Sequence, residues 1–394
     1  MTYTATRRGA YSGLVVQAIT NNLSPILFII FQESFGFSYE RLGTLVVINF
    51  VIQVAVMSLG IILVEKLGYR IPAVTAQGCA TLGLVLLGAL PMLMQNAYAG
   101  LVIATAIGAV GGGLSELILS PMMNALPTPP NQKASAMSFL HSFFSWGQAG
   151  TILISTLFLY LAGGARWWIL PVLWAVIPLL NMVLFMLVPL PEHIGQKERM
   201  SVKELFLSPL FLVFILLMVC GAASELTVAQ WASLFIERGL GLSKVLGDIA
   251  GPCMFAVMMG VGRILYSVLS GRISYQVYMA ASALLCVVCY LLIALSPSPV
   301  FSLIGCALSG LATSVMWPGT LSCAAARFPS GGTPMFGSLA IFGGLGCSLG
   351  PWVAGVVADN AVGGLRTGIL VATVFPAAMI LLILAIGIKR KQKA

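Results

Sequence analysis

Long apolar runs recur along the whole chain, and the connections between them are short. Each run has about the 20 residues that a helix needs to cross the hydrocarbon core of a bilayer. Of the 394 residues, 59% are hydrophobic and only 8% are charged. A soluble domain carries roughly 25% charged residues, so this chain has too few polar groups to cover a surface in water. The sequence therefore predicts an all-α membrane protein.

The apolar runs can be divided into twelve predicted spans. They cover residues 9–31, 42–64, 71–94, 98–126, 134–162, 167–190, 207–236, 247–270, 277–295, 299–325, 334–358 and 364–388. The longest polar connection, 191–206, separates six spans from six. We therefore expect an N-terminal six-helix bundle at 1–190, a cytoplasmic linker at 191–206 and a C-terminal six-helix bundle at 207–394.

The basic residues indicate how these spans are oriented. If both termini are cytoplasmic, only five of the 20 Lys and Arg residues lie outside, and the other fifteen lie inside. The outside group is Arg41, Arg166, Arg238, Lys244 and Arg366. Because cytoplasmic loops are enriched in Lys and Arg, this split favours cytoplasmic termini. The net charge of +9 is thus a topology signal, and we expect no nucleic-acid partner.

The two halves of the chain share weak sequence features. Gly113 and Pro121 in the fourth predicted span are eight residues apart, as are Gly310 and Pro318 in the tenth. The segment between spans two and three, 65–70, has a counterpart after span eight. Together these matches indicate two homologous halves, which is a common construction of membrane transporters.

At this point the chain resembles the major facilitator superfamily over its whole length. The family's loop after the second span carries a gating motif of acidic, basic, glycine and basic residues. The motif residues here are Glu65, Lys66, Gly68 and Arg70, with Gly262, Arg263 and Arg272 in the second half. The resemblance implies the major facilitator fold, in which twelve transmembrane helices form two six-helix halves around a cavity that opens alternately to each side.

A narrower similarity is to the fucose permease-like branch of that superfamily. It rests on Gly113, Glu116 and Pro121 in span four, and on short polar or aromatic matches elsewhere. Those matches are Asn21-Asn22, His141, Glu225 with Trp231, and Trp317-Pro318. This resemblance implies proton-linked uptake of a sugar.

Glu116 and Glu225 lie deep in predicted spans. An ionised carboxylate at mid-membrane costs about 2.5–3.5 kcal/mol on insertion scales, which favours uptake of a proton. Glu116 is therefore the first candidate for proton coupling, assisted by Glu225 or His141. The alternative is that each carboxyl hydrogen-bonds a facing helix and only fixes packing.

We expect polar and aromatic side chains of the spans to line a substrate cavity. Ser138, His141, Ser145 and Gln148 recur at helical spacing and form one polar stripe, which has no reason to face lipid. For each tryptophan within a span, plain packing is the alternative. The expected substrate-binding residues are Asn21, Asn22, Gln53, Glu116, Ser120, His141, Ser145, Gln148, Trp231 and Trp317. Trp167 and Trp168, at a predicted water boundary, are expected to anchor the chain instead.

The sequence as a whole predicts a secondary active transporter for a small polar solute, with a sugar as the leading class. No catalytic motif, nucleotide-binding loop or metal site is found, so we expect no enzyme activity and no cofactor; a proton gradient supplies the energy. We expect a monomer in the inner membrane of a prokaryote, with lipid and solute as its partners. The alternatives are an exporter of lipophilic or amphipathic compounds and a non-transporting membrane receptor.

Overall fold

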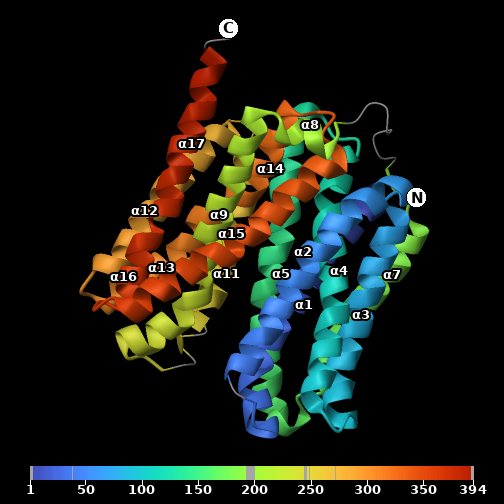
Figure 1. Ribbon diagram of the computed structural model, residues 1–394, viewed down its shortest axis with the longest axis vertical. Coiled ribbons are helices and arrows are strands. Elements are labelled where there is room, and N and C mark those ends of the chain that lie inside the picture. Colours follow the sequence, from blue (N-terminus) through green and yellow to red (C-terminus); the bar gives the residue numbers. More distant parts are fainter. Residues whose placement is uncertain are drawn as a thin grey trace. The chain divides into compact units, whose positions relative to one another are not determined.

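The computed structural model describes residues 3–37, 39–191, 200–243, 246–247, 249–270 and 272–391, without the side chains of 29, 39, 40, 65, 238, 239 and 386–391. This part of the chain is helical and contains no strand (Figure 1). Its α-helices are α1 Tyr3–Phe35, α2 Tyr39–Leu67, α3 Arg70–Leu93, α4 Ala97–Ala125, α5 Lys133–Ala162, α6 Ile169–Trp174, α7 Val176–Leu187, α8 Val202–Phe206, α9 Pro209–Leu234, α11 Met254–Leu269, α12 Tyr275–Leu295, α13 Pro299–Thr313, α14 Met316–Arg327, α15 Gly332–Asn360, α16 Leu365–Ala372 and α17 Val374–Lys391. Two π-helical turns, η4 Phe235–Gly239 and η5 Ile249–Cys253, flank the connection between α9 and α11.

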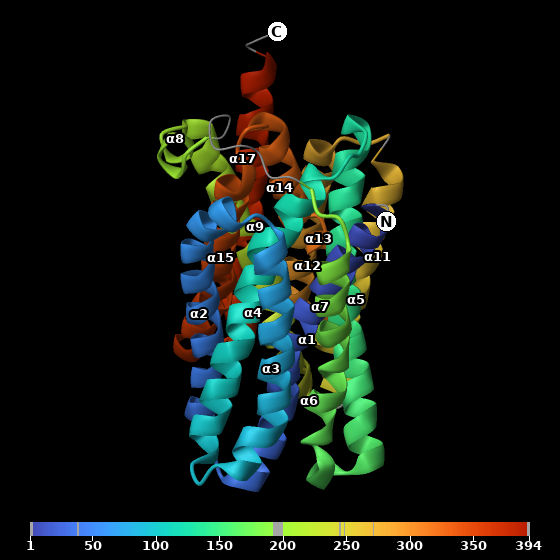
Figure 2. The ribbon, with the colours of Figure 1, turned by 90° about the vertical axis from the view of Figure 1, so that its right-hand side faces the viewer.

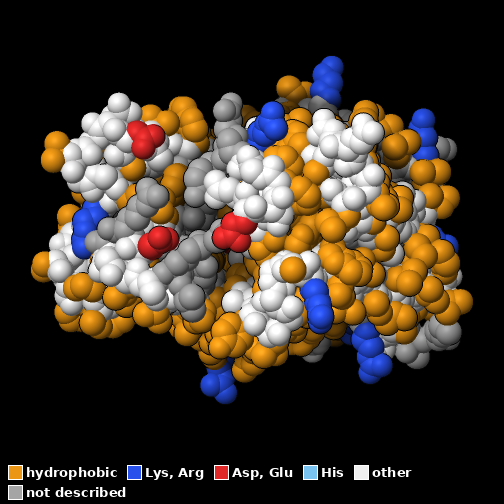
Figure 3. All heavy atoms as spheres, turned by 90° about the horizontal axis from the view of Figure 1, so that it is seen from below, with side chains coloured by type: hydrophobic (Ala, Val, Ile, Leu, Met, Phe, Trp, Pro, Cys, Tyr) orange, Lys and Arg blue, Asp and Glu red, His pale blue; other side chains and the backbone are white. Residues whose placement is uncertain are grey.

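The helices confirm the predicted membrane architecture. Eleven stretches of the described chain, from Arg41–Val64 to Leu365–Ala385, are long and apolar enough to cross a bilayer. α1, with 33 residues, supplies the first span. Many large apolar side chains on these helices are exposed, such as Leu93 at 79% and Leu161 at 73%. In Figure 3 hydrophobic side chains cover much of the visible surface, and charged ones are scattered. Such a surface suits lipid and not water.

Three of the predicted spans are broken into two helices, and each break precedes a proline. Pro178, Pro318 and Pro376 lie in the first turn of α7, α14 and α17. Proline has no N–H to donate, and its ring crowds the carbonyl four residues earlier, so the preceding helix ends there. The carbonyls so released need other donors, because lipid offers none.

The chain divides into two compact units. Unit 1 comprises 1–127 and 146–198, and unit 2 comprises 128–145 and 199–394. The first thirteen residues of α5, 133–145, therefore cluster with unit 2, and its remainder with unit 1. Half of the predicted linker 191–206, residues 192–199, lies outside the described residues, and its bounds stay a prediction. Its end forms α8, where the N–H and hydroxyl of Ser201 hydrogen-bond with Glu204 and lower the pKa of its carboxyl.

Unit 1 is held together by close contacts among its long helices. α3 packs along α4, and α4 also packs against α2 (Figure 2). An apolar core near one end includes Leu27, Phe31 and Trp167, with the two rings edge to face at 5.0 Å. The expected anchoring role of Trp167 is wrong, because its side chain is 2% exposed in this core, whereas Trp168 is 43% exposed.

Two glycines that match in sequence make the same kind of contact in the two units. A Cβ atom added to Gly113 of α4 would lie 2.9 Å from the carbonyl oxygen of Gln53 on α2. One added to Gly310 of α13 would lie 2.1 Å from the carbonyl oxygen of Phe255 on α11. In each unit a glycine thus permits direct backbone contact between helices, as small residues do in membrane bundles.

We predict that Gly113→Ala lowers the thermal stability of the purified protein, because the added methyl group must displace backbone of α2. Overpacking of this kind costs about 1–3 kcal/mol. Gly108→Ala on the same helix is the matched control, since its Cβ would meet nothing within 4 Å. The measurement is the melting temperature of both variants in detergent. Equal melting temperatures would contradict the close contact of α2 with α4.

Candidate functional site

The carboxyl of Glu116 sits on α4 within unit 1 and meets a polar partner from α1. Gln17 donates a hydrogen bond from Nε2 to Glu116 Oε2. The Gln17 side chain is 4% exposed, while Glu116 is half-buried. Ser120, one turn further along α4, is also buried. The predicted acid is therefore held inside the unit by a neutral amide, and it keeps a partly open side.

A cluster of amides lies one helical turn from Gln17. Asn21 Oδ1 accepts hydrogen bonds from Gln53 Nε2 at 2.9 Å and from Asn49 Nδ2 at 3.5 Å. Gln53 is 5% exposed, and it fits against α4 because Gly112 has no side chain there. The structure thus brings together the predicted residues Asn21 and Gln53 and adds Asn49. Asn22 instead donates to the carbonyl of Ala18 on its own helix, at 2.8 Å.

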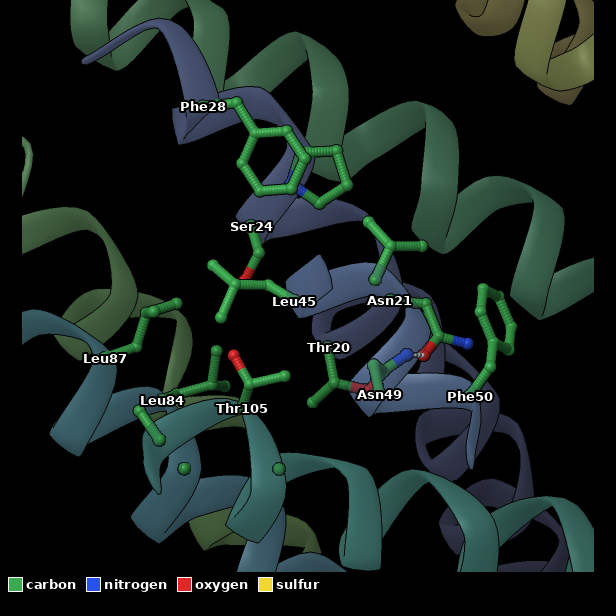
Figure 4. Close-up of a pocket in the computed structure, with 15 residues that line it drawn as sticks. Thr20, Asn21, Ser24, Phe28, Leu45, Asn49, Phe50, Leu84, Leu87 and Thr105 are labelled. Atoms are coloured by element: carbon green, nitrogen blue, oxygen red, sulfur yellow. Dashed lines mark hydrogen bonds between the residues drawn. The ribbon is translucent and has the colours of Figure 1, made fainter. Parts of the chain in front are cut away.

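A pocket in unit 1 opens beside this amide cluster (Figure 4). Its volume is about 50 Å³, and the lining residues come from α1, α2, α3 and α4. Polar and apolar side chains both line it. The polar lining residues are Thr20, Asn21, Ser24, Asn49 and Thr105. Of these, the sequence prediction of the site contained only Asn21. Thr105 is a single polar residue in an apolar run, a pattern too weak to distinguish it, and Thr20 precedes the more polar Asn21-Asn22.

Arg263 is a deeply buried charge of unit 2. The sequence placed it in a cytoplasmic motif, but it lies inside α11, at 2% exposure. Its position in a helix agrees with the predicted span 247–270, and its gating role stays a prediction. Its Nε donates to the carbonyl of Ser314 at 2.9 Å. That carbonyl is available because Pro318, four residues later, has no N–H to offer it.

The other two guanidinium nitrogens of Arg263 contact the carboxyl of Glu225 and groups of α5. Nη2 lies 3.5 Å from Glu225 Oε2 on α9. Nη1 donates to the backbone carbonyl of His141 and to Ser145 Oγ, both at 2.8 Å. In return, Ser138 Oγ donates to the carbonyl of Arg263 at 2.8 Å. Four of the predicted polar residues, Ser138, His141, Ser145 and Glu225, thus meet around this cation, although three of them were expected in the N-terminal bundle.

The remaining predicted residues take separate positions. Trp231 Nε1 donates to the carbonyl of Pro351 at 2.9 Å. The ring of Trp317 packs against Gly343, and its buried Nε1 has no hydrogen-bond partner among the described residues. Gln148 is half-buried in the part of α5 that belongs to unit 1, so unit 2 contains only three members of the predicted stripe.

The motif after α2 acts as a helix junction in unit 1. Gly68 has φ +70°, a conformation that favours glycine, and its N–H closes the end of α2 on Val64. The Arg70 guanidinium donates to the carbonyls of Phe185, Met186 and Val188 at the end of α7. Lys66 and Arg272 are exposed, Gly262 packs on Ser314, and the side chain of Glu65 lies outside the described residues.

We predict that the Arg263–Glu225 pair shows strong coupling in a double-mutant cycle. Arg263→Met alone leaves a buried carboxylate uncompensated, and breaking such a pair costs about 3–5 kcal/mol. Arg263→Met with Glu225→Met removes both charges, so its melting temperature in detergent should lie above that of the single Arg263 variant. A double variant at least as unstable as the sum of the two singles would contradict the coupling.

Comparison with known proteins supports this fold. The family model described as Major Facilitator Superfamily matches residues 10–351. The fucose:proton symporter of E. coli has a TM-score of 0.80 at 19% identity, covering 97% of this chain and 98% of that one. A proton:xylose symporter has a TM-score of 0.82 at 13% identity, covering 97% and 95%. A human organic anion transporter has a TM-score of 0.72 at 16% identity, covering 97% of this chain and 100% of that one. A search of curated proteins finds no match.

Proposed function

Because this chain belongs to the Major Facilitator Superfamily of membrane transporters, we propose that it carries a small polar solute together with a proton by alternating access. A sugar is the leading class of solute. Two solved structures that share the fold are those of a fucose:proton symporter and a proton:xylose symporter. At such low identity the structural likeness shows the fold alone, so the proposal rests on the residues of this chain.

The observation that carries the proposal is the half-buried carboxyl of Glu116 bonded by Gln17. A carboxylate in a membrane helix favours proton uptake, because its charge is costly there. The hydrogen bond from Gln17 is strongest while Glu116 is charged, since charge-assisted bonds are about twice as strong as neutral ones. Taking up a proton therefore weakens the hydrogen bond that joins α1 to α4. A bound proton thereby changes how the helices beside the solute are held.

The polar groups near Glu116 suit an uncharged solute. Asn21, Asn49 and Gln53 supply both donors and acceptors without net charge. The buried cation of unit 2, Arg263, is already occupied by Ser314, α5 and Glu225, so it is not available for an anionic solute. Trp231 and Trp317 offer aromatic faces in unit 2 that can pack on the C–H surface of a sugar ring.

We place the transported proton on Glu116 before Glu225. A proton on Glu225 would leave the charge of Arg263 uncompensated inside the unit, and a buried charge without a partner is strongly destabilising. Glu225 and His141 are assigned an assisting role, through the group that holds α5. His141 contributes its backbone carbonyl to that group.

The orientation and the energy source complete the proposal. Removing the buried Arg263 from the cytoplasmic count leaves fourteen basic residues inside and five outside, which still favours cytoplasmic termini. We propose a monomer in a prokaryotic inner membrane, driven by the proton gradient and without a cofactor. One charge that moves through 100 mV gains about 2.3 kcal/mol.

We predict that Glu116→Gln abolishes accumulation driven by a pH gradient, with a loss of tenfold or more in proteoliposomes. Counterflow of the solute should continue, because exchange needs no net proton movement. The solute is first selected by thermal shift against a panel that includes fucose, xylose and glucose. Glu33→Gln, which neutralises an exposed acid on the same unit, is the control and should accumulate solute normally.

Each possible failure has a distinct meaning. Full pH-driven accumulation by Glu116→Gln would refute the coupling role of this residue. Drug sensitivity in a deletion strain without any change in sugar uptake would favour an exporter of lipophilic compounds. Binding without counterflow for every ligand that shifts the melting temperature would favour a receptor.

A further inference from the structure

The pocket of unit 1 contains hydroxyl and amide groups that the proposed coupling step does not use. In Figure 4, Ser24, Thr20 and Asn49 surround the same space as Thr105, opposite Leu84 and Leu87. Thr105 Oγ1 is buried and has no hydrogen-bond partner among the described residues. Buried polar groups without a protein partner usually bind ordered water. The unpaired hydroxyl therefore favours bound water in the pocket.

The size of the pocket agrees with water as its ligand. A site needs about 10–15 Å³ of room for one water, together with two to four polar partners. The pocket offers about 50 Å³ and five polar lining residues. It can hold a short chain of waters, whereas a hexose would not fit. Pro25 on its rim is exposed, so the space can be reached from outside the unit.

Along α1 the pocket ends one helical turn from Gln17, and along α4 it ends two turns from Glu116. Asn21 lines it, and Gln17, the partner of Glu116, lies one turn earlier on α1. On α4, Gly108 lines the pocket, and Gly112 and Glu116 follow on the same face at four-residue spacing. One turn is about 5.4 Å, close to the length of two hydrogen bonds. A single water can bridge the turn between Asn21 and Gln17.

A second polar group without a hydrogen-bond partner lies beside Glu116. Gln17 Oε1 is buried and accepts no hydrogen bond within the described part of the chain. Its own amide nitrogen is committed to Glu116. Thr105 at one end and Gln17 at the other thus both leave positions for water, and the amide cluster of Asn21, Asn49 and Gln53 lies between them.

We propose that this pocket inside unit 1 is a water-filled proton entrance to Glu116. The inference rests on the proposed function, because it assigns a route to the proton that Glu116 takes up. A hydronium ion at the rim passes a proton along the water chain. An O–H bond forms on the Glu116 carboxylate, and the hydronium ion is left as water. The polar lining orients the waters and does not itself change protonation state.

Gly108→Val tests this entrance, because its side chain would project into the pocket and its Cβ would meet nothing within 4 Å. The full-length protein in lipid vesicles is subjected to a rapid drop in pH. Infrared absorption of the protonated carboxyl then reports the protonation of Glu116, and the band is identified by its loss in Glu116→Gln. We expect Gly108→Val to slow the protonation tenfold or more and to leave its final extent unchanged.

Gly150→Val is the matched control, since Gly150 also lies in a long helix of unit 1 with free space around its Cβ. It should protonate at the unchanged rate. Unchanged kinetics in Gly108→Val would overturn the proton entrance and leave the coupling role of Glu116 intact. If Glu116→Gln removes no titrating band, both the coupling role and the entrance fail.

Thr105→Val provides a second variant that keeps the shape of the side chain and removes one water partner. We expect a slowing of threefold or more. Thr151→Val is its control, because the Thr151 hydroxyl already donates to the carbonyl of Gly147 at 2.7 Å. A Thr105 variant that is as fast as the Thr151 variant would contradict the role of the hydroxyl, whatever the folding of Gly108→Val.

Discussion

Lipid offers no hydrogen bonds, so every polar side chain inside these helices needs a partner from the protein or from water. Arg263 shows the consequence most clearly, because each nitrogen of its buried guanidinium has a neighbour on another helix. In unit 1 the same demand is met without cations, by Gln17 on Glu116 and by Gln53 and Asn49 on Asn21. These pairings hold the helices of each unit in a fixed arrangement.

The backbone takes part in these pairings at its irregular points. Pro318 ends α13 and leaves the carbonyl of Ser314 for Arg263, so one sequence feature both breaks the helix and creates an acceptor. Gly113 lets α2 approach α4, and Gly310 lets α11 approach α13. Prolines and glycines therefore determine where polar groups can meet, although they carry no chemistry themselves.

The two units differ in the kind of polar chemistry they contain. Unit 1 combines one candidate proton site with neutral amides and a small pocket, which suits loading of a proton beside an uncharged solute. Unit 2 contains a compensated charge pair that also holds the first part of α5. α5 continues from unit 2 into unit 1.

Hydropathy alone determined the twelve spans, because the free-energy cost of placing a segment in lipid depends only on that segment's own residues. The same cost drew attention to Glu116 and Glu225. Only the tertiary structure decided which groups meet: that Arg263 pairs with Glu225, that Asn22 turns to its own helix, and that Thr105 and Asn49 share a pocket with Asn21. Partners depend on which faces of different helices pack together, and helical periodicity within one segment does not contain that information.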